Sequence, residues 1–193
     1  MAIQGREGAH SINGMIWDKA NQGRQADEPD TNVVRFVARN FYGVSDRSKV
    51  HFLDIGSGRH APITTYLIRK GFTSVTAVDF APGALAHIHQ DICTVDSFAP
   101  DSFDCVLDNN TLCHVENPPI EKIKTWLKPS GKFFSVTPAD DTWRGHLDGK
   151  GFCRCATVED ILKIYAPFPH VQLGRASYSH GNHAITSWLV EAT

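Results

Sequence analysis

Two closely spaced glycines follow an acid in the segment FLDIGSGRHAP, residues 52–62. Gly56 and Gly58 allow a tight turn and a close approach of the backbone to a ligand. The helix expected over 61–70 offers free N–H groups at its start. Asp79, about 20 residues further on, is placed to accept hydrogen bonds from both hydroxyls of a ribose. This order predicts a strand, a loop and a helix that enclose a nucleotide-like ligand.

The glycines alone do not decide which nucleotide binds, because Gly56-Ser57-Gly58 also fits a dinucleotide fingerprint with Ala61 at the third small position. Asp54 separates the two interpretations. A carboxylate two residues before the first glycine repels the doubly negative pyrophosphate of a dinucleotide. S-adenosylmethionine carries an ammonium and a sulfonium group and no phosphate, so its pocket accepts acids.

Four acids are expected where successive parallel strands end, and these strand ends meet at one crevice. The expected strands are 50–53, 74–78, 86–90 and 103–107, and the acids that follow them are Asp54, Asp79, Asp91 and Asp108. One such acid often caps a turn, but four in this order favour a common site. The link before the third strand is unusual, because residues 80–86 have room only for a single helical turn at 82–85.

Strand and helix patterns alternate through the middle of the chain, which predicts parallel strands with crossover helices. The last two expected strands, 171–176 and 184–191, have no helix between them and should pair antiparallel. The prediction is an α/β fold: a single Rossmann-like domain over 1–193, with a mostly parallel seven-stranded sheet and an antiparallel terminal hairpin. Within it we expect a cofactor-covering segment at 1–29, a cofactor-binding core at 48–137, and an acceptor loop with the closing hairpin at 138–193.

The chain resembles the class I S-adenosylmethionine-dependent methyltransferases of the small-molecule type. The resemblance lies in the segments LDIGSG (53–58), VTAVDF (75–80), HQDI (89–92), FDCVLDNNTLCHV (103–115) and WLKPSGKFFSV (126–136). WDKANQG at 17–23 also resembles the N-terminal helix that covers the cofactor in that family. His60 departs from the pattern by replacing the third glycine, and the short link before Asp91 leaves one side of the adenine pocket thinly covered.

The resemblance implies a set of cofactor contacts. It places Gly56 and Gly58 behind the methionine part, Asp79 on the ribose, Asp91 on the adenine amine, and Trp17 against the sulfonium, a favourable cation–aromatic contact. The remaining residues expected in the cofactor site are Asp54, Ser57, His60, Phe80, Ile92, Asp108 and Asn109.

The acceptor site is expected beyond the strand at 103–107. His114 is the candidate general base, because a pKa of about 6.5 suits proton transfer near neutrality. Asp108 is expected to assist catalysis by orienting the acceptor. Residues that we expect to contact the acceptor are Asn110, Trp143, Arg144, His146 and Tyr178.

Composition limits the alternatives. A net charge of -2 and a pI near 6.5 argue against a dedicated nucleic-acid binder. The chain shows no apolar run long enough for a membrane span. Five cysteines without a secretory signal predict a reducing cytoplasm. Cys153-x-Cys155 and His180-x-x-His183 lack the usual ligand spacing, so no metal is predicted.

The sequence therefore predicts methyl transfer from S-adenosylmethionine to oxygen or nitrogen of a small-molecule acceptor. It leaves open a methyltransferase acting on nucleic acid or protein, a non-catalytic module that binds the same cofactor, an enzyme using it for other chemistry, and a NAD-type oxidoreductase. The acceptor itself and the formation of a homodimer also stay open.

Overall fold

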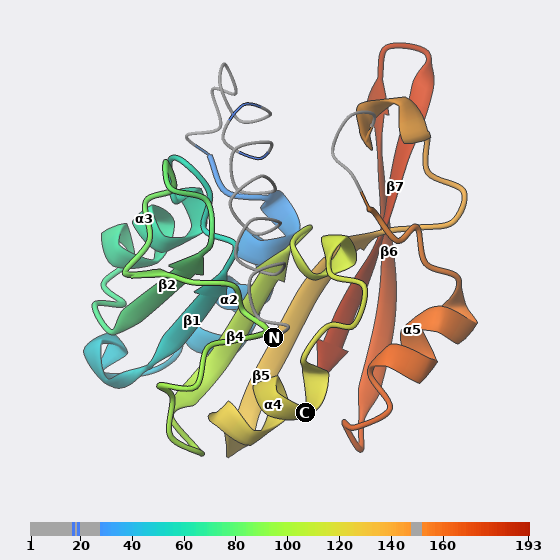
Figure 1. The fold of residues 1–193 in the computed structure, drawn as a ribbon. Helices are drawn as coiled ribbons and strands as arrows, with labels where there is room; N and C mark the ends of the chain where they lie inside the picture. The colour runs from blue at the N-terminus through green and yellow to red at the C-terminus, as the bar shows by residue number, and fades with distance from the viewer. Residues whose placement is uncertain (1–16, 18, 20–27, 148–151) are drawn as a thin grey trace, which may run out of the picture.

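One seven-stranded sheet organises the residues that the structure, a computed structural model, describes: 17, 19, 28–147 and 152–193. The strand order is β3-β2-β1-β4-β5-β7-β6 (Figure 1). The first five strands pair in parallel, and β7 pairs antiparallel with both β5 and β6. The predicted α/β sheet with its terminal hairpin is confirmed. The strands are β1 (Phe52–Ile55), β2 (Val75–Asp79), β3 (Ile88–His89), β4 (Phe103–Asn109), β5 (Leu127–Pro138), β6 (Val171–His180) and β7 (His183–Ala192).

Helices cover both faces of this sheet. The α-helices are α2 (Thr31–Phe41), α3 (Pro62–Arg69), α4 (Ile120–Trp126) and α5 (Val158–Ile164), and short 3₁₀ helices are η1 (Arg47–Lys49), η2 (Leu112–His114) and η3 (Arg144–Leu147). Asp30 caps α2, since its Oδ1 accepts a hydrogen bond of 2.7 Å from the Asn32 N–H. Within the part of the chain that the structure describes, no helix combines the length and apolarity that a membrane crossing requires.

The hydrophobic core has two layers, one on each face of the sheet, because successive side chains of a strand point to opposite faces. Phe52 of β1 packs with α2 and α3, whereas its neighbour Leu53 packs with α4 and α5. In β5, Phe134 stacks on Phe36 of α2 with ring centroids 4.4 Å apart, and Phe133 belongs to the opposite layer. Both faces of the central strands are therefore buried, which leaves the ends of the strands as the place for a ligand.

The structure corrects two expected strands. β1 begins and ends two residues later than 50–53, so Asp54 lies inside the strand instead of after it. The strand expected at 86–90 contains only Ile88 and His89. Here the His87 side chain takes part in the pairing, because its Nδ1 accepts a hydrogen bond of 2.9 Å from the Ala77 N–H. The segment expected as a helical turn at 82–85 is a plain turn, so β2 and β3 are joined without a crossover helix.

Candidate active site

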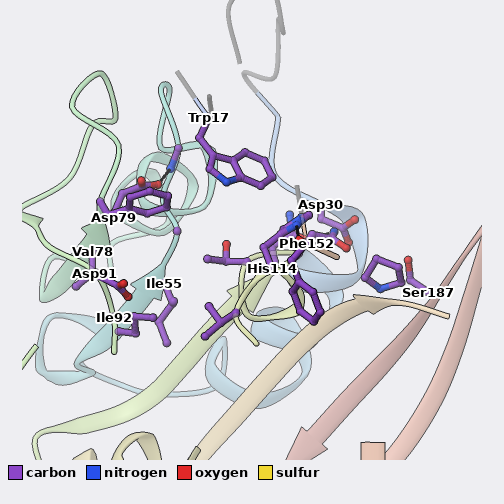
Figure 2. A pocket seen from close by; sticks show the side chains of 18 of the residues that line it. Trp17, Asp30, Ile55, Val78, Asp79, Asp91, Ile92, His114, Phe152 and Ser187 are labelled. Carbon is purple, nitrogen blue, oxygen red and sulfur yellow. Dashed lines mark hydrogen bonds between the residues drawn. The ribbon is translucent and has the colours of Figure 1, made fainter. Parts of the chain in front are cut away.

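A cavity of about 640 Å³ opens at the carboxyl ends of β1, β2 and β4, the position where ligands bind in open α/β sheets. Figure 2 shows two groups of lining residues. Asp79, Asp91 and Ile92 lie on the side of β2 and β3, whereas Trp17, His114 and Phe152 lie on the opposite side. The volume is typical of a small-molecule or cofactor site.

The glycine loop after β1 also lines the cavity. Gly56 and Gly58 have φ angles of +73° and +70°, a conformation in which side chains are strained. A Cβ atom on Gly56 would lie 1.9 Å from Thr111 Oγ1, whereas a Cβ on Gly58 would meet nothing within 4 Å. Gly56 thus permits close packing inside the protein, and Gly58 leaves open space that a ligand can fill.

Asp79 holds this loop in place at the end of β2. Its Oδ2 accepts a hydrogen bond from the Gly58 N–H and its Oδ1 one from the Ala81 N–H, both at 2.8 Å. The side chain also lines the cavity. Because an ionised carboxylate has about four lone-pair sites, Asp79 can bind the loop and accept further hydrogen bonds from a ligand.

Asp91 continues the same wall beyond β3. Its Oδ1 accepts a hydrogen bond of 2.9 Å from the Cys93 N–H, which fixes the carboxylate at the cavity edge. Ile92 and Phe80 line the cavity beside it. The part of the wall beyond β3 therefore combines Asp91 with an apolar surface, which suits a flat heterocycle that carries an amino group.

Asp54 and Asp108 do not line the cavity, contrary to the expectation that all four acids face one crevice. Asp54 is buried because β1 extends past it, and its Oδ2 accepts a hydrogen bond of 2.7 Å from the Thr64 hydroxyl of α3. Asp108 is fully buried: its Oδ1 accepts from the backbone N–H groups of Thr111 and Leu112, and its Oδ2 from the Ser135 hydroxyl. Asp108 thus positions the turn that leads to His114 and is not placed to touch an acceptor.

These two buried acids make stability depend on pH. Burial is the main cause that raises the pKa of Asp54 and of Asp108 from 3.8 to about 6. The folded chain therefore binds these protons more tightly than the unfolded chain. As the pH rises from about 4 to about 6, the free energy of unfolding is expected to fall by roughly 3 kcal/mol for each group.

Asp54→Asn removes one of the two acids but keeps an oxygen that can accept from Thr64, so the fall should be smaller in this variant. Urea unfolding of both proteins across this pH range measures the difference. Asp96→Asn, at an exposed carboxylate, is the matched control. Identical pH profiles for wild type and Asp54→Asn would show that Asp54 does not titrate there.

His114 faces the cavity from η2, directly beyond β4 (Figure 2). Its Nδ1 lies 2.8 Å from the Phe152 carbonyl oxygen. Since that oxygen can only accept, Nδ1 carries the hydrogen, and in the neutral ring Nε2 keeps a lone pair. The Trp17 ring meets the imidazole edge-on, with centroids 4.5 Å apart and planes at 68°.

The other predicted residues separate into two groups. Asn109, Asn110 and Tyr178 line the cavity together with the glycines and the residues described above. Ser57 and His60 do not: the Ser57 hydroxyl donates to the Leu85 carbonyl, and His60 is exposed.

The predicted acceptor loop also lies away from the cavity in its described part. Trp143 stacks on His183, with ring centroids 4.4 Å apart and an interplanar angle of 4°. Arg144 is exposed and is not among the lining residues. His146 belongs to η3, and its side chain lies outside what the structure describes.

Sequence reasoning missed several lining residues because distant segments bring them to the cavity. Thr111 packs against Gly56. The one sequence signal for its place in the cavity is its position three residues after Asp108. No local pattern singled out the others, which are Asp30, Ile55, Val78, Gln90, Val115, Glu116, Pro138, Phe152, Ile185 and Ser187. Among the described lining residues, four are carboxylates and none is lysine or arginine. The cavity therefore favours a positively charged ligand over one with phosphate groups.

Comparison of the chain with known proteins identifies its family. The family model for a methyltransferase domain matches residues 23–183. A comparison with curated proteins gives no match. Solved structures do match, at low sequence identity.

Three of these structures illustrate the likeness. Haemonchus contortus phosphoethanolamine N-methyltransferase 2, in complex with phosphomonomethylethanolamine and S-adenosylhomocysteine, is 15% identical with a TM-score of 0.65, over 95% of this chain and 57% of that one. The chain thus spans little more than half of that enzyme. Burkholderia thailandensis 1,6-didemethyltoxoflavin-N1-methyltransferase, with bound 1,6-didemethyltoxoflavin and S-adenosylhomocysteine, is 18% identical with a TM-score of 0.66, over 96% and 88%. The PH0226 protein from Pyrococcus horikoshii OT3 is 13% identical with a TM-score of 0.64, over 93% and 96%.

At these identities the structures establish the fold alone, whereas the family model covers most of the chain. The protein therefore belongs to the methyltransferase domain family.

Proposed function

We propose that this methyltransferase transfers the methyl group of S-adenosylmethionine to an oxygen or nitrogen atom of a small-molecule acceptor. The observation that carries the proposal is the cavity itself. It combines a glycine loop held by Asp79 with a lining that has carboxylates and no cationic side chain among the described residues. A sulfonium cofactor suits this charge, and two of the structural neighbours bind S-adenosylhomocysteine.

The described residues fit such a cofactor. The open space at Gly58 can take the methionine part, and Asp79 can accept from the ribose hydroxyls. Asp91 can accept from the adenine amine, with Ile92 and Phe80 against the ring. Trp17 lines the cavity on the opposite side, which supports the proposal that the segment before residue 30 covers the cofactor.

The acceptor would enter beside His114, where Phe152, Asn110 and Tyr178 also line the cavity. The bound cofactor supplies an already activated methyl group, so the task of these side chains is to align the acceptor atom with it. Alignment can account for roughly 7–11 kcal/mol of a reaction barrier. The Nε2 lone pair of His114 provides a proton acceptor where the acceptor atom must lose a proton.

The cavity volume of about 640 Å³ favours a metabolite-sized acceptor over a macromolecule. We therefore expect that, with methyl-labelled S-adenosylmethionine, label moves into the low-mass fraction of a cell extract. Separate reactions with the purified protein and nucleic-acid fractions of the same extract provide the comparison. Label that enters only protein or only nucleic acid would overturn the small-molecule assignment while leaving methyl transfer intact.

A further inference from the structure

Three potential metal ligands converge at the acceptor side of the cavity. One ligand atom each from Cys113, His114 and Cys153 lies within 4.8 Å of the other two. Cys113 is buried at the centre of η2, and Cys153 is half-buried. We propose that these three side chains, with Cys155 as the fourth ligand, bind a structural Zn²⁺ ion.

The spacing of the donor atoms suits a tetrahedral ion. Zinc–sulfur bonds of about 2.3 Å and zinc–nitrogen bonds of about 2.0–2.1 Å place tetrahedral ligand atoms roughly 3.5–3.8 Å apart. The 4.8 Å limit that contains the three donor atoms exceeds this by about 1 Å. Binding would draw the donor atoms together by about 1 Å.

Cys155 lies next to this group. Cys155 is half-buried and lies two residues after Cys153, and the thiols of Cys113 and Cys155 both interact with the Cys153 thiol. Three sulfurs and one imidazole form a soft donor set that selects zinc over magnesium or calcium. None of these three cysteines forms a disulfide.

One ring nitrogen of His114 is held by a backbone carbonyl. Metal-bound histidines usually donate the second ring N–H to a carboxylate or a backbone carbonyl. The Nδ1–H of His114 donates to the Phe152 carbonyl at 2.8 Å, which leaves Nε2 with the lone pair for the ion.

The backbone holds the two contributing segments together independently of any ion. The Arg154 N–H donates to the Cys113 carbonyl at 2.8 Å, and the Arg154 guanidinium donates to the carbonyls of Val115 and Glu116 at 3.3 and 2.6 Å. The ligands thus start close together, which lowers the entropic cost of binding an ion. Sequence spacing did not indicate this site, because Cys153-x-Cys155 lacks the usual ligand spacing and Cys113 lies 40 residues before Cys153.

Zinc at this place would fix η2 to residues 152–155. Because His114 and Phe152 both line the cavity, the ion would set the shape of the acceptor wall; this last point rests on the proposed function. Zinc would engage the lone pair that otherwise makes His114 a proton acceptor. Methyl transfer by the zinc-loaded protein would then use His114 to position the acceptor, and any proton lost by the acceptor would go to solvent.

The test is the metal content of the full chain, expressed with zinc and purified under reducing conditions without chelators. We expect stoichiometric zinc, and after exchange with Co²⁺ the visible bands of a tetrahedral site together with thiolate-to-cobalt charge transfer. Cys153→Ser should lose both the zinc and the spectrum. Cys93→Ser, at an exposed cysteine outside the cluster, should keep both. Cys155→Ser should weaken the charge-transfer band, and an unchanged band would remove Cys155 from the ligand set.

Zinc no higher in wild type than in Cys153→Ser, or a Cys113–Cys153 disulfide found by mass spectrometry in the purified protein, would overturn the proposal. Calorimetric binding of S-adenosylhomocysteine gives an independent readout, because the cofactor wall lies across the cavity from the cluster. We expect Cys153→Ser to bind S-adenosylhomocysteine as wild type does. Absence of binding in both proteins would instead contradict the proposed function, whatever their zinc content.

Discussion

Asp79→Ala is expected to weaken binding of S-adenosylhomocysteine by about 10²–10⁴-fold. Two ribose hydroxyls lose a charged acceptor, and each such hydrogen bond contributes about 1.5–3 kcal/mol. The variant also frees the N–H groups of Gly58 and Ala81, which the carboxylate now holds. Calorimetric titration measures the change, and Glu121→Ala, at an exposed carboxylate of α4, is the control.

A modified ligand separates the ribose contact from the loop contact. If Asp79 accepts from the ribose, the 2′-deoxy analogue of S-adenosylhomocysteine binds wild type more weakly than the parent ligand does. In Asp79→Ala both ligands should then bind with the same low affinity. A full 2′-deoxy penalty that persists in the variant would assign the ribose contact to another residue.

The two glycines of the loop are expected to respond differently to the same substitution. Gly56→Ala should lower the free energy of unfolding by roughly 2–5 kcal/mol, since an unfavourable φ costs about 1–2 kcal/mol and overpacking about 1–3. The overpacking arises because the new Cβ would lie 1.9 Å from Thr111 Oγ1. Gly58→Ala should carry only the backbone cost of about 1–2 kcal/mol, because its Cβ meets no protein atom within 4 Å.

For cofactor affinity, in contrast, we expect a clear effect of the Gly58 substitution. The Cβ of Gly58→Ala would occupy space that we assign to the cofactor, so its affinity for S-adenosylhomocysteine should fall by at least about tenfold in a protein that stays folded. Urea unfolding and calorimetry measure the two effects separately. Gly43→Ala, which has open space and no positive φ, should change neither. Unchanged affinity in Gly58→Ala would place the cofactor elsewhere in the cavity.

Local sequence order was enough to predict the sheet and part of the site. Alternating strands and helices bring the strand ends to one edge, so Gly56, Gly58, Asp79 and Asp91 could be predicted as cavity residues. The same reasoning failed for Asp54, because β1 ends two residues later than expected and turns that side chain toward α3. A small shift at a strand end decides whether an acid lines a cavity or is buried beneath it.

The acceptor side depended on contacts that no local pattern encodes. Phe152 lines the cavity, and its carbonyl accepts from His114, 38 residues earlier in the chain. Trp143 was predicted to line the site, but its ring stacks on His183, and its backbone N–H donates to the Ala184 carbonyl of β7. The proposed zinc ligands are likewise adjacent only in the folded chain.

The shortness of β3 bears on solubility. An edge strand presents unpaired N–H and C=O groups that can recruit a strand from another molecule, and a very short edge strand offers few of them. With only Ile88 and His89 in β3, this edge of the sheet is a poor template for aggregation. The opposite edge, β6, spans ten residues, and it carries Arg175, whose guanidinium pairs with Asp141. The β3 edge thus offers an incoming strand far fewer groups to pair with than the β6 edge does.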